Sequence, residues 1–185
     1  MSYDLKKRLI ELIREKAYEK KSVILASGRK SDFYIDTRQV TLHPEGAHLT
    51  GKLIYQLIQS FDKIVEGVGG LTMGADPIAT AVSLISYLEG KGIPAFIVRK
   101  EAKKHGLGLW IEGKKNLKDG ANVVIVEDVI TSGGSSIKAC ERALSEGLNV
   151  LAVITLVDRE EGGREAVEAK GISFYAVVKK SDIVN

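Results

Sequence analysis

The sequence predicts an α/β fold in which a mostly parallel central sheet is flanked by helices. Short runs rich in β-branched residues alternate with segments of helical periodicity along most of the chain. Strands that alternate with helices are joined by right-handed crossovers, which build a parallel sheet covered on both faces. The run 122–126 is apolar at nearly every position, as expected for a strand buried on both sides.

Length and composition favour one globular domain. The chain has 185 residues, of which 44% are hydrophobic and 28% charged, so a disordered or fibrous protein is not expected. The net charge of +3 is too small to indicate a nucleic-acid-binding protein. Residues 1–18 are charged and amphipathic, unlike a signal peptide, and no apolar run approaches the ~20 residues that span a bilayer. We therefore expect a cytoplasmic protein that binds neither nucleic acid nor a membrane.

Cysteine and histidine offer little metal chemistry. Cys140 is the only cysteine, which excludes an intrachain disulfide, and its place on an inferred helix predicts a small buried side chain. The histidines at 43, 48 and 105 lack the spacing of a zinc site.

The chain divides into an N-terminal piece, residues 1–40, and an α/β core, residues 41–185. The elements expected up to residue 61 are a helix over 4–19, short strands at 23–25 and 33–36 around a turn at Ser27–Gly28, and a helix over 46–60. Those expected in the core are strands at 64–68, 95–98, 123–126, 150–157 and 172–178 and helices at 77–88, 135–146 and 164–169. Asp76 before Pro77 is interpreted as a helix cap.

The strongest functional signal follows the strand 123–126. Two carboxylates, Glu127 and Asp128, precede a turn over 131–135 that opens a helix. Such a turn presents backbone N–H groups at the positive end of the helix, which is an anion site, and glycines let a phosphate approach closely. Acids beside an anion site suit a ligand that also carries hydroxyl groups or a metal, as a ribose 5-phosphate does. The alternative is an ordinary turn with solvated acids.

This segment resembles the PRPP-binding motif of type I phosphoribosyltransferases, where PRPP is phosphoribosyl pyrophosphate. The resemblance implies that Glu127 and Asp128 hold the ribose hydroxyls. It also implies that five residues surround the 5′-phosphate, namely Thr131, Ser132, Gly133, Gly134 and Ser135, and that Val129 and Ile130 contact PRPP. The implied fold is a type I phosphoribosyltransferase core with a small N-terminal hood. The implied cofactor is Mg²⁺, bound mainly through PRPP, with Asp128 as a candidate ligand.

A basic segment follows the strand 95–98. Composition alone favours a solvated basic loop, but the order Arg99, Lys100, Lys103, His105 resembles the catalytic loop of orotate phosphoribosyltransferases. The resemblance implies that these four residues are catalytic and cover the diphosphate of PRPP. It also implies a homodimer in which the loop 99–112 reaches the partner's site. The apolar tip of this loop, Leu107, Leu109 and Trp110, departs from the family pattern, and we expect it to pack on the partner or the closed loop.

The glycine-rich run 67–77 is expected to join a strand to a helix. By itself it is equally consistent with a tight turn and with an anion site. In phosphoribosyltransferases the corresponding turn binds pyrophosphate. Thr72 and Met73 stand where many bacterial orotate enzymes have Tyr-Lys, so one cation is missing here.

Two further segments point to the base. Residues 27–38 resemble the hood motif of orotate phosphoribosyltransferases, which implies that Tyr34 and Ile35, beside Phe33, contact orotate. Arg159 follows the strand 150–157, and its guanidinium suits a carboxylate; the resemblance makes it, with Thr131, an orotate contact. The alternative for the hood segment is an ordinary core strand, and the alternative for Arg159 is a surface salt bridge. Ala26 replaces a lysine common in relatives.

The resemblance spans the chain from Leu5 to about Val178 and implies transfer of ribose 5-phosphate from PRPP to orotate in pyrimidine (UMP) biosynthesis. Two alternatives stay open at this point. One is a purine phosphoribosyltransferase, and the other is a PRPP-sensing regulator without catalysis.

Overall fold

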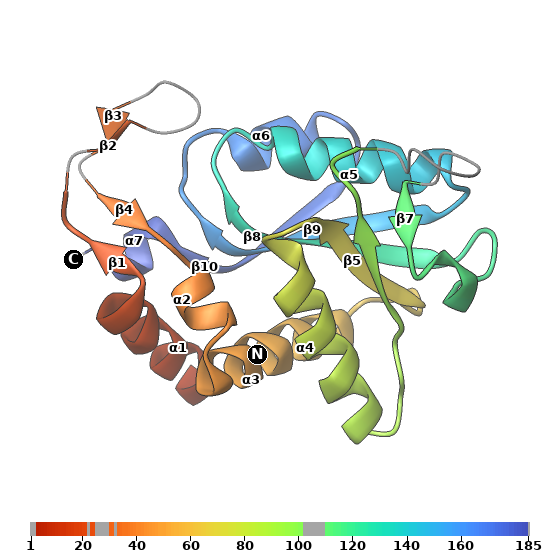
Figure 1. Cartoon of the computed structure of the whole chain (residues 1–185), viewed down its shortest axis with the longest axis horizontal. Coiled ribbons are helices and arrows are strands. Elements are labelled where there is room, and N and C mark those ends of the chain that lie inside the picture. Colours follow the sequence, from red (N-terminus) through yellow and green to blue (C-terminus); the bar gives the residue numbers. More distant parts are fainter. Residues whose placement is uncertain (1–2, 22, 25–29, 32, 102–109, 185) are drawn as a thin grey trace.

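The computed structural model describes residues 3–21, 23–24, 30–31, 33–101 and 110–184. The central sheet has six strands in the order β10-β9-β8-β5-β6-β7 (Figure 1). The first five are parallel, and β7 pairs antiparallel with β6. Their bounds are β5 Gly67–Leu71, β6 Ala95–Val98, β7 Ile111–Glu112, β8 Asn122–Ile130, β9 Asn149–Asp158 and β10 Ser173–Lys179. The predicted fold class, a mostly parallel sheet flanked by helices, is confirmed.

Helices cover both faces of this sheet. In Figure 1, α1, α3 and α4 lie below it and α5 and α6 above it. The helices are α1 Tyr3–Lys16, α2 Arg38–Thr41, α3 Pro44–Ile58, α4 Ala75–Leu88, α5 Gly134–Ser145, α6 Gly163–Glu168 and α7 Lys180–Ile183, with a 3₁₀ turn at Lys114–Asn116. No helix in the described part of the chain is long and apolar enough to cross a membrane.

The two faces have separate hydrophobic cores, and the strand β8 contributes to both. Val124 and Val126 pack with the α1, α3 and α4 side, whereas Val123 and Ile125 pack with α5. This alternation is the two-residue period of a β-strand. Cys140 is buried in the α5 core, as predicted.

The N-terminal residues pack into the larger core rather than apart from it. Leu9, Leu12 and Ile13 of α1 share one cluster with α3 and α4. Short strands are present within the predicted ranges 23–25 and 33–36, but they do not pair with each other: β4 (Tyr34–Ile35) pairs with β1 (Tyr18–Glu19). The strand β2 (Val23–Ile24) pairs with β3 (Lys30–Ser31) instead. Two-residue strands are too short to carry a periodic signal.

The strand predicted at 64–68 actually runs from Gly67 to Leu71. Ile64 is 80% exposed and lies outside the strand. The strand contains glycines because its neighbours leave no room for a side chain at these positions. A Cβ on Gly69 would lie 2.3 Å from the carbonyl oxygen of Phe96, and one on Gly70 would lie 2.1 Å from that of Val126. Close backbone packing therefore outweighs the low strand propensity of glycine.

Three other expectations on element ends are corrected. The helix predicted over 4–19 ends at Lys16. The helix α4 begins at Ala75 with Gly74 as its N-cap, so Asp76 is not the capping residue; it accepts a hydrogen bond from Thr72 Oγ1 at 2.7 Å. The strand β8 continues to Ile130, past both predicted carboxylates.

Candidate active site

Two adjoining cavities lie at the carboxyl ends of β5, β8 and β9, where ligands bind in open parallel sheets. The β5 cavity, about 310 Å³, contains Thr72, Met73, Lys100 and Asp128 in its lining. The β8 cavity, about 430 Å³, is lined by the whole predicted turn, Thr131 to Ser135, and by Arg159. Both cavities share Tyr34, Ile35, Glu127, Val129 and Ser135 in their linings.

The two carboxylates after residue 126 point to opposite faces of β8. Because the strand continues through them, Glu127 lies on the same face as Ile125. Asp128 lies on the opposite face, with Val126. Glu127 Oε2 accepts a hydrogen bond from Ser136 Oγ of α5 at 3.0 Å. Asp128 Oδ2 accepts one from Thr37 Oγ1 at 3.1 Å, from the segment that leads into α2.

The environments of these two acids differ. Glu127 is 6% exposed, and burial, followed by the charge of Asp128, raises the pKa of the Glu127 carboxyl to about 8. Asp128 is half-buried in the β5 cavity. A Cβ on Gly74 would lie 2.5 Å from Asp128 Oδ1, so a glycine is needed there for this carboxylate to occupy its position.

The turn over 131–135 has the form of an anion site. Gly133 is the N-cap of α5 with φ +83°, a left-handed conformation that glycine adopts without strain. Ser132, Gly134 and Ser135 are exposed, and a Cβ on Gly134 would meet nothing within 4 Å. The first N–H groups of a helix have no partner within the helix, so an anion in the β8 cavity can accept from them.

Arg159 faces the same cavity from the end of β9. It is 3% exposed, its Nε lies 3.0 Å from Glu161 Oε1, and its guanidinium carbon lies 4.3 Å from the Phe33 ring centroid. Its backbone N–H donates to Ile130 O at 3.1 Å, which ties the ends of β9 and β8. Glu161 holds the Nε edge of this guanidinium and the Phe33 ring lies against its flat face. A guanidinium held in this way can bind a planar carboxylate with well-defined geometry.

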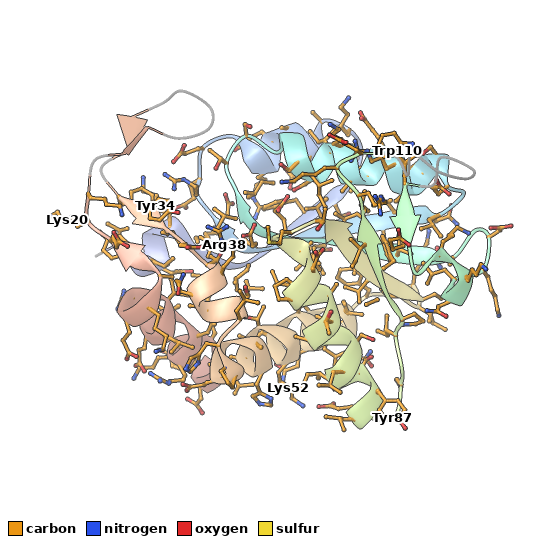
Figure 2. All side chains as sticks on the ribbon, viewed as in Figure 1. Lys20, Tyr34, Arg38, Lys52, Tyr87 and Trp110 are labelled. Carbon is orange, nitrogen blue, oxygen red and sulfur yellow. The ribbon has the colours of Figure 1, made fainter. Side chains whose placement is uncertain are left out.

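The predicted hood residues close the site from the other side. Tyr34 and Ile35 line both cavities, and Figure 2 shows the Tyr34 side chain on the β4 segment, across from the sheet. The earlier part of the hood motif, Ser27 to Arg29, lies outside the described residues, as does Ala26.

The basic segment is only partly assembled around the cavities. Lys100 lines the β5 cavity. Arg99 does not line either cavity; its Nη1 pairs with Glu112 Oε1 of β7 at 2.8 Å, so its guanidinium is held at the far edge of the sheet. Lys103, His105, Leu107 and Leu109 lie outside the described residues.

Trp110, predicted to pack on a partner or the closed loop, has a contact within its own chain. The guanidinium carbon of Arg142 lies 4.0 Å from the centroid of its ring. The ring is partly buried against the α5 core.

Comparison with known proteins identifies the family. A model of the phosphoribosyl transferase domain matches residues 36–178. An orotate phosphoribosyltransferase of Sorangium cellulosum is 45% identical over 179 residues, covering 97% of this chain and 93% of that protein. One from a Nostoc species is 46% identical, covering 97% and 85%. The chain belongs to the orotate phosphoribosyltransferase family.

Solved structures of the family agree with this fold. Orotate phosphoribosyltransferase of Mycobacterium tuberculosis in complex with Fe(III) dicitrate superposes with a TM-score of 0.84 at 39% identity, covering 98% of this chain and 99% of that one. The same protein in complex with PRPP gives a TM-score of 0.79 at 37% identity, covering 97% and 98%.

In this family member the turn after β5 contributes few polar side chains. The Thr72–Met73 peptide bond is cis, Met73 is 63% exposed, and the Thr72 hydroxyl is bound to Asp76. Cations facing the β5 cavity come instead from Lys100 and from Arg38, whose Nε pairs with Asp36 at 2.7 Å.

Sequence reasoning missed several residues that shape this site. Thr37 and Ser136 each hold one of the two carboxylates, and Glu161 holds Arg159. Ser136 could have been found, because it directly follows the phosphate turn and lies in the first turn of the predicted helix, where its side chain can reach the end of the preceding strand. Thr37 could not, because its partner is 91 positions away.

Proposed function

We propose that this chain is an orotate phosphoribosyltransferase: it transfers ribose 5-phosphate from PRPP to orotate and gives orotidine 5′-monophosphate and pyrophosphate, a step of pyrimidine biosynthesis. The observation that carries the proposal is the β8 cavity, where Arg159 faces the same space as Glu127 and the helix N-terminal turn 131–135. A cation for a carboxylate thus shares one cavity with a hydroxyl acceptor and an anion site.

The sugar phosphate occupies the carboxyl end of β8. The 5′-phosphate accepts hydrogen bonds from the amides and hydroxyls of Thr131 to Ser135. The ribose hydroxyls donate to Glu127 and Asp128, whose positions on opposite faces of the strand let them take different hydroxyl groups. Val129 and Ile130 line the space between the acids and the turn.

The diphosphate lies in the β5 cavity, beside Thr72 and Met73. Lys100 lines this cavity, and Lys103, His105 and Arg99 follow the order of the family's catalytic loop. Mg²⁺ prefers oxygen ligands and keeps several waters. The half-buried carboxylate of Asp128 fits such an ion, which would be held mainly by PRPP and would neutralise charge on the leaving diphosphate when bound.

Orotate lies between Arg159 and the hood residues Tyr34 and Ile35, next to Thr131. Its carboxylate accepts a bidentate hydrogen bond from Arg159, and adenine and guanine have no carboxylate for this arginine. A purine cannot form this charge-assisted pair, and its loss is the basis of base selectivity.

The protein contributes position and charge rather than a covalent intermediate. Orotate N1 attacks the anomeric carbon as the bond to the diphosphate breaks, with inversion and an oxocarbenium-like transition state. Holding the two reactants in line converts a bimolecular step into an effectively unimolecular one. Preorganised donors at the phosphate and diphosphate stabilise the charges that develop.

The active form is a cytoplasmic homodimer in which the segment 99–112 reaches the partner's site. An apolar groove of α2, α3 and α4 adjoins the β5 cavity and shares Arg38 and Met73 with it. Exposed apolar side chains gather on this groove, and such surfaces mark interaction sites. They are Leu42, Met73, Leu84 and Leu88. Sedimentation that gives only monomer at assay concentration would contradict the dimer.

One assay tests the function. Orotate consumption is followed by absorbance with PRPP and Mg²⁺, and adenine, guanine and xanthine are tried in its place. Turnover of orotate alone is expected. Turnover of a purine, or PRPP binding without turnover of any base, would show the purine enzyme or the regulator instead.

The same assay separates the roles of two cations. Arg159→Ala should raise the KM for orotate about 100-fold, in line with the loss of a buried charged pair. Lys103→Ala should lower kcat with a modest effect on orotate. The opposite pattern would refute this division of roles.

A further inference from the structure

A buried arginine on α5 has no role in the site described so far. Arg142 is 8% exposed and lies in the last turns of α5. In the described part of the chain no carboxylate forms an ion pair with it. A buried charge is costly to desolvate and is a weak source of stability, so its contacts must explain why an arginine is here.

Its contacts are with the two ends of the basic segment. Nη1 of Arg142 donates to the carbonyl oxygen of Arg99, and Nη2 donates to that of Lys100 at 2.9 Å. The flat face of the same guanidinium lies 4.0 Å from the centroid of the Trp110 ring. One side chain therefore holds residues on both sides of Lys103 and His105 in the sequence.

Glu146, the C-cap residue of α5, adds another tie. Its Oε1 accepts a hydrogen bond from the backbone N–H of Trp110 at 3.2 Å. The two ends are also joined directly, since Arg99 N donates to Trp110 O at 2.9 Å. Figure 2 shows Trp110 beside α5, at the edge of the sheet near β7.

The same helix carries the phosphate site at its other end. Gly133 caps α5, and Ser136 in its first turn holds Glu127. A single rigid helix thus connects the sugar-phosphate contacts to the base of the segment that bears the diphosphate cations.

We propose that Arg142 is a positioning residue for the transfer reaction: its clamp on Arg99, Lys100 and Trp110 fixes both ends of the catalytic segment to α5 and so aims this segment at the partner's site. The inference rests on the proposed function. It requires the planar, multi-donor guanidinium, because a lysine cannot bind two carbonyl groups and stack on a ring at once.

The test uses the full chain and three variants. Arg142→Met removes the donors and keeps the length of the side chain, and Arg142→Lys keeps the charge. Arg164→Met is the matched control. Arg164 belongs to the neighbouring helix α6 and lies outside the site, and its guanidinium carbon is 4.6 Å from the centroid of the Phe174 ring. Kinetics with orotate and PRPP are measured with thermal unfolding and with fluorescence of Trp110, the only tryptophan.

Arg142→Met should lower kcat roughly tenfold or more, as expected when a misplaced group disturbs an aligned reaction. The KM for orotate should stay within about twofold, because Arg159 and the hood are untouched. The Trp110 emission should change in intensity or maximum. Arg142→Lys should recover only part of kcat, and Arg164→Met should match the wild type in kcat and emission.

Wild-type kcat in Arg142→Met or Arg142→Lys, with changed Trp110 emission, would overturn the proposal, because the clamp would be lost without effect. If Arg142→Met does not fold, Arg142→Lys decides: full activity contradicts the clamp, and a folded protein with reduced kcat supports it. A wild-type chain that does not use orotate refutes the proposed function instead, so the two failures are distinguishable.

Discussion

Two glycine-rich turns, after β5 and after β8, look alike in sequence but differ in what their glycines do. In the β8 turn, Gly133 has a positive φ and Gly134 faces open space, so the amides are accessible to a ligand. In the β5 run, Gly69 and Gly70 lie inside the strand against neighbouring carbonyl groups. Glycine density therefore indicates close backbone approach, and only the structure shows whether a ligand or another strand approaches.

Among these substitutions, Gly70→Ala should cause the largest loss of stability. Its Cβ would lie 2.1 Å from Val126 O and 2.6 Å from Ala75 Cβ, so β5, β8 and α4 must move apart. We expect loss of at least about 3 kcal/mol of unfolding free energy, at the upper end of overpacking costs. Chemical denaturation measures this, and wild-type stability would contradict the packing role.

Gly133→Ala should affect PRPP binding more selectively. Alanine at φ +83° costs about 1–2 kcal/mol, and relief of this strain would turn the amides of the phosphate site. We expect PRPP affinity to fall about tenfold, equivalent to ~1.4 kcal/mol, while the orotate KM changes little. Calorimetric titration measures it, with Gly171→Ala as the control: it places an alanine at a similar φ, +73°, outside both cavities, and should bind PRPP like the wild type.

Gly74→Ala tests the one glycine of the β5 turn that serves the site. A Cβ there would lie 2.5–2.8 Å from the Asp128 carboxylate and displace it. PRPP affinity should then fall about as much as in Asp128→Asn, a few-fold to tenfold. The double variant should bind no worse than either single one, since the changes share one partner. Additive losses would show that Gly74 does not act through Asp128.

A further prediction concerns the pH dependence of stability and Glu127. Its pKa, about 8 in the folded chain against 4.5 ordinarily, means that the folded state keeps a proton that the unfolded state has lost between these values. Stability is therefore full below about pH 4.5 and falls as pH rises towards 8. Glu127→Gln should remove this slope. Thermal unfolding of metal- and ligand-free protein measures it, and parallel curves for both proteins would contradict the shift.

Much of the fold and of the β8 site could be predicted, because each depends on local signals. The alternation of apolar runs gives the sheet, and the order of acids, hydroxyls and glycines gives the turn 131–135. The placement of Glu127 and Asp128 on opposite faces could not be predicted, since the polar residues hide the continuation of β8 to Ile130. Arg142 could not either: a helical arginine normally indicates a solvated face, and its partners are 42 and 43 positions away.

The most direct test of the account is a crystal structure of this chain with PRPP and Mg²⁺. We predict the 5′-phosphate at the backbone amides of Thr131 to Ser135, the ribose hydroxyls at Glu127 and Asp128, and the diphosphate beside Lys100. Density for PRPP elsewhere, with residues 127–135 free of ligand, would contradict it.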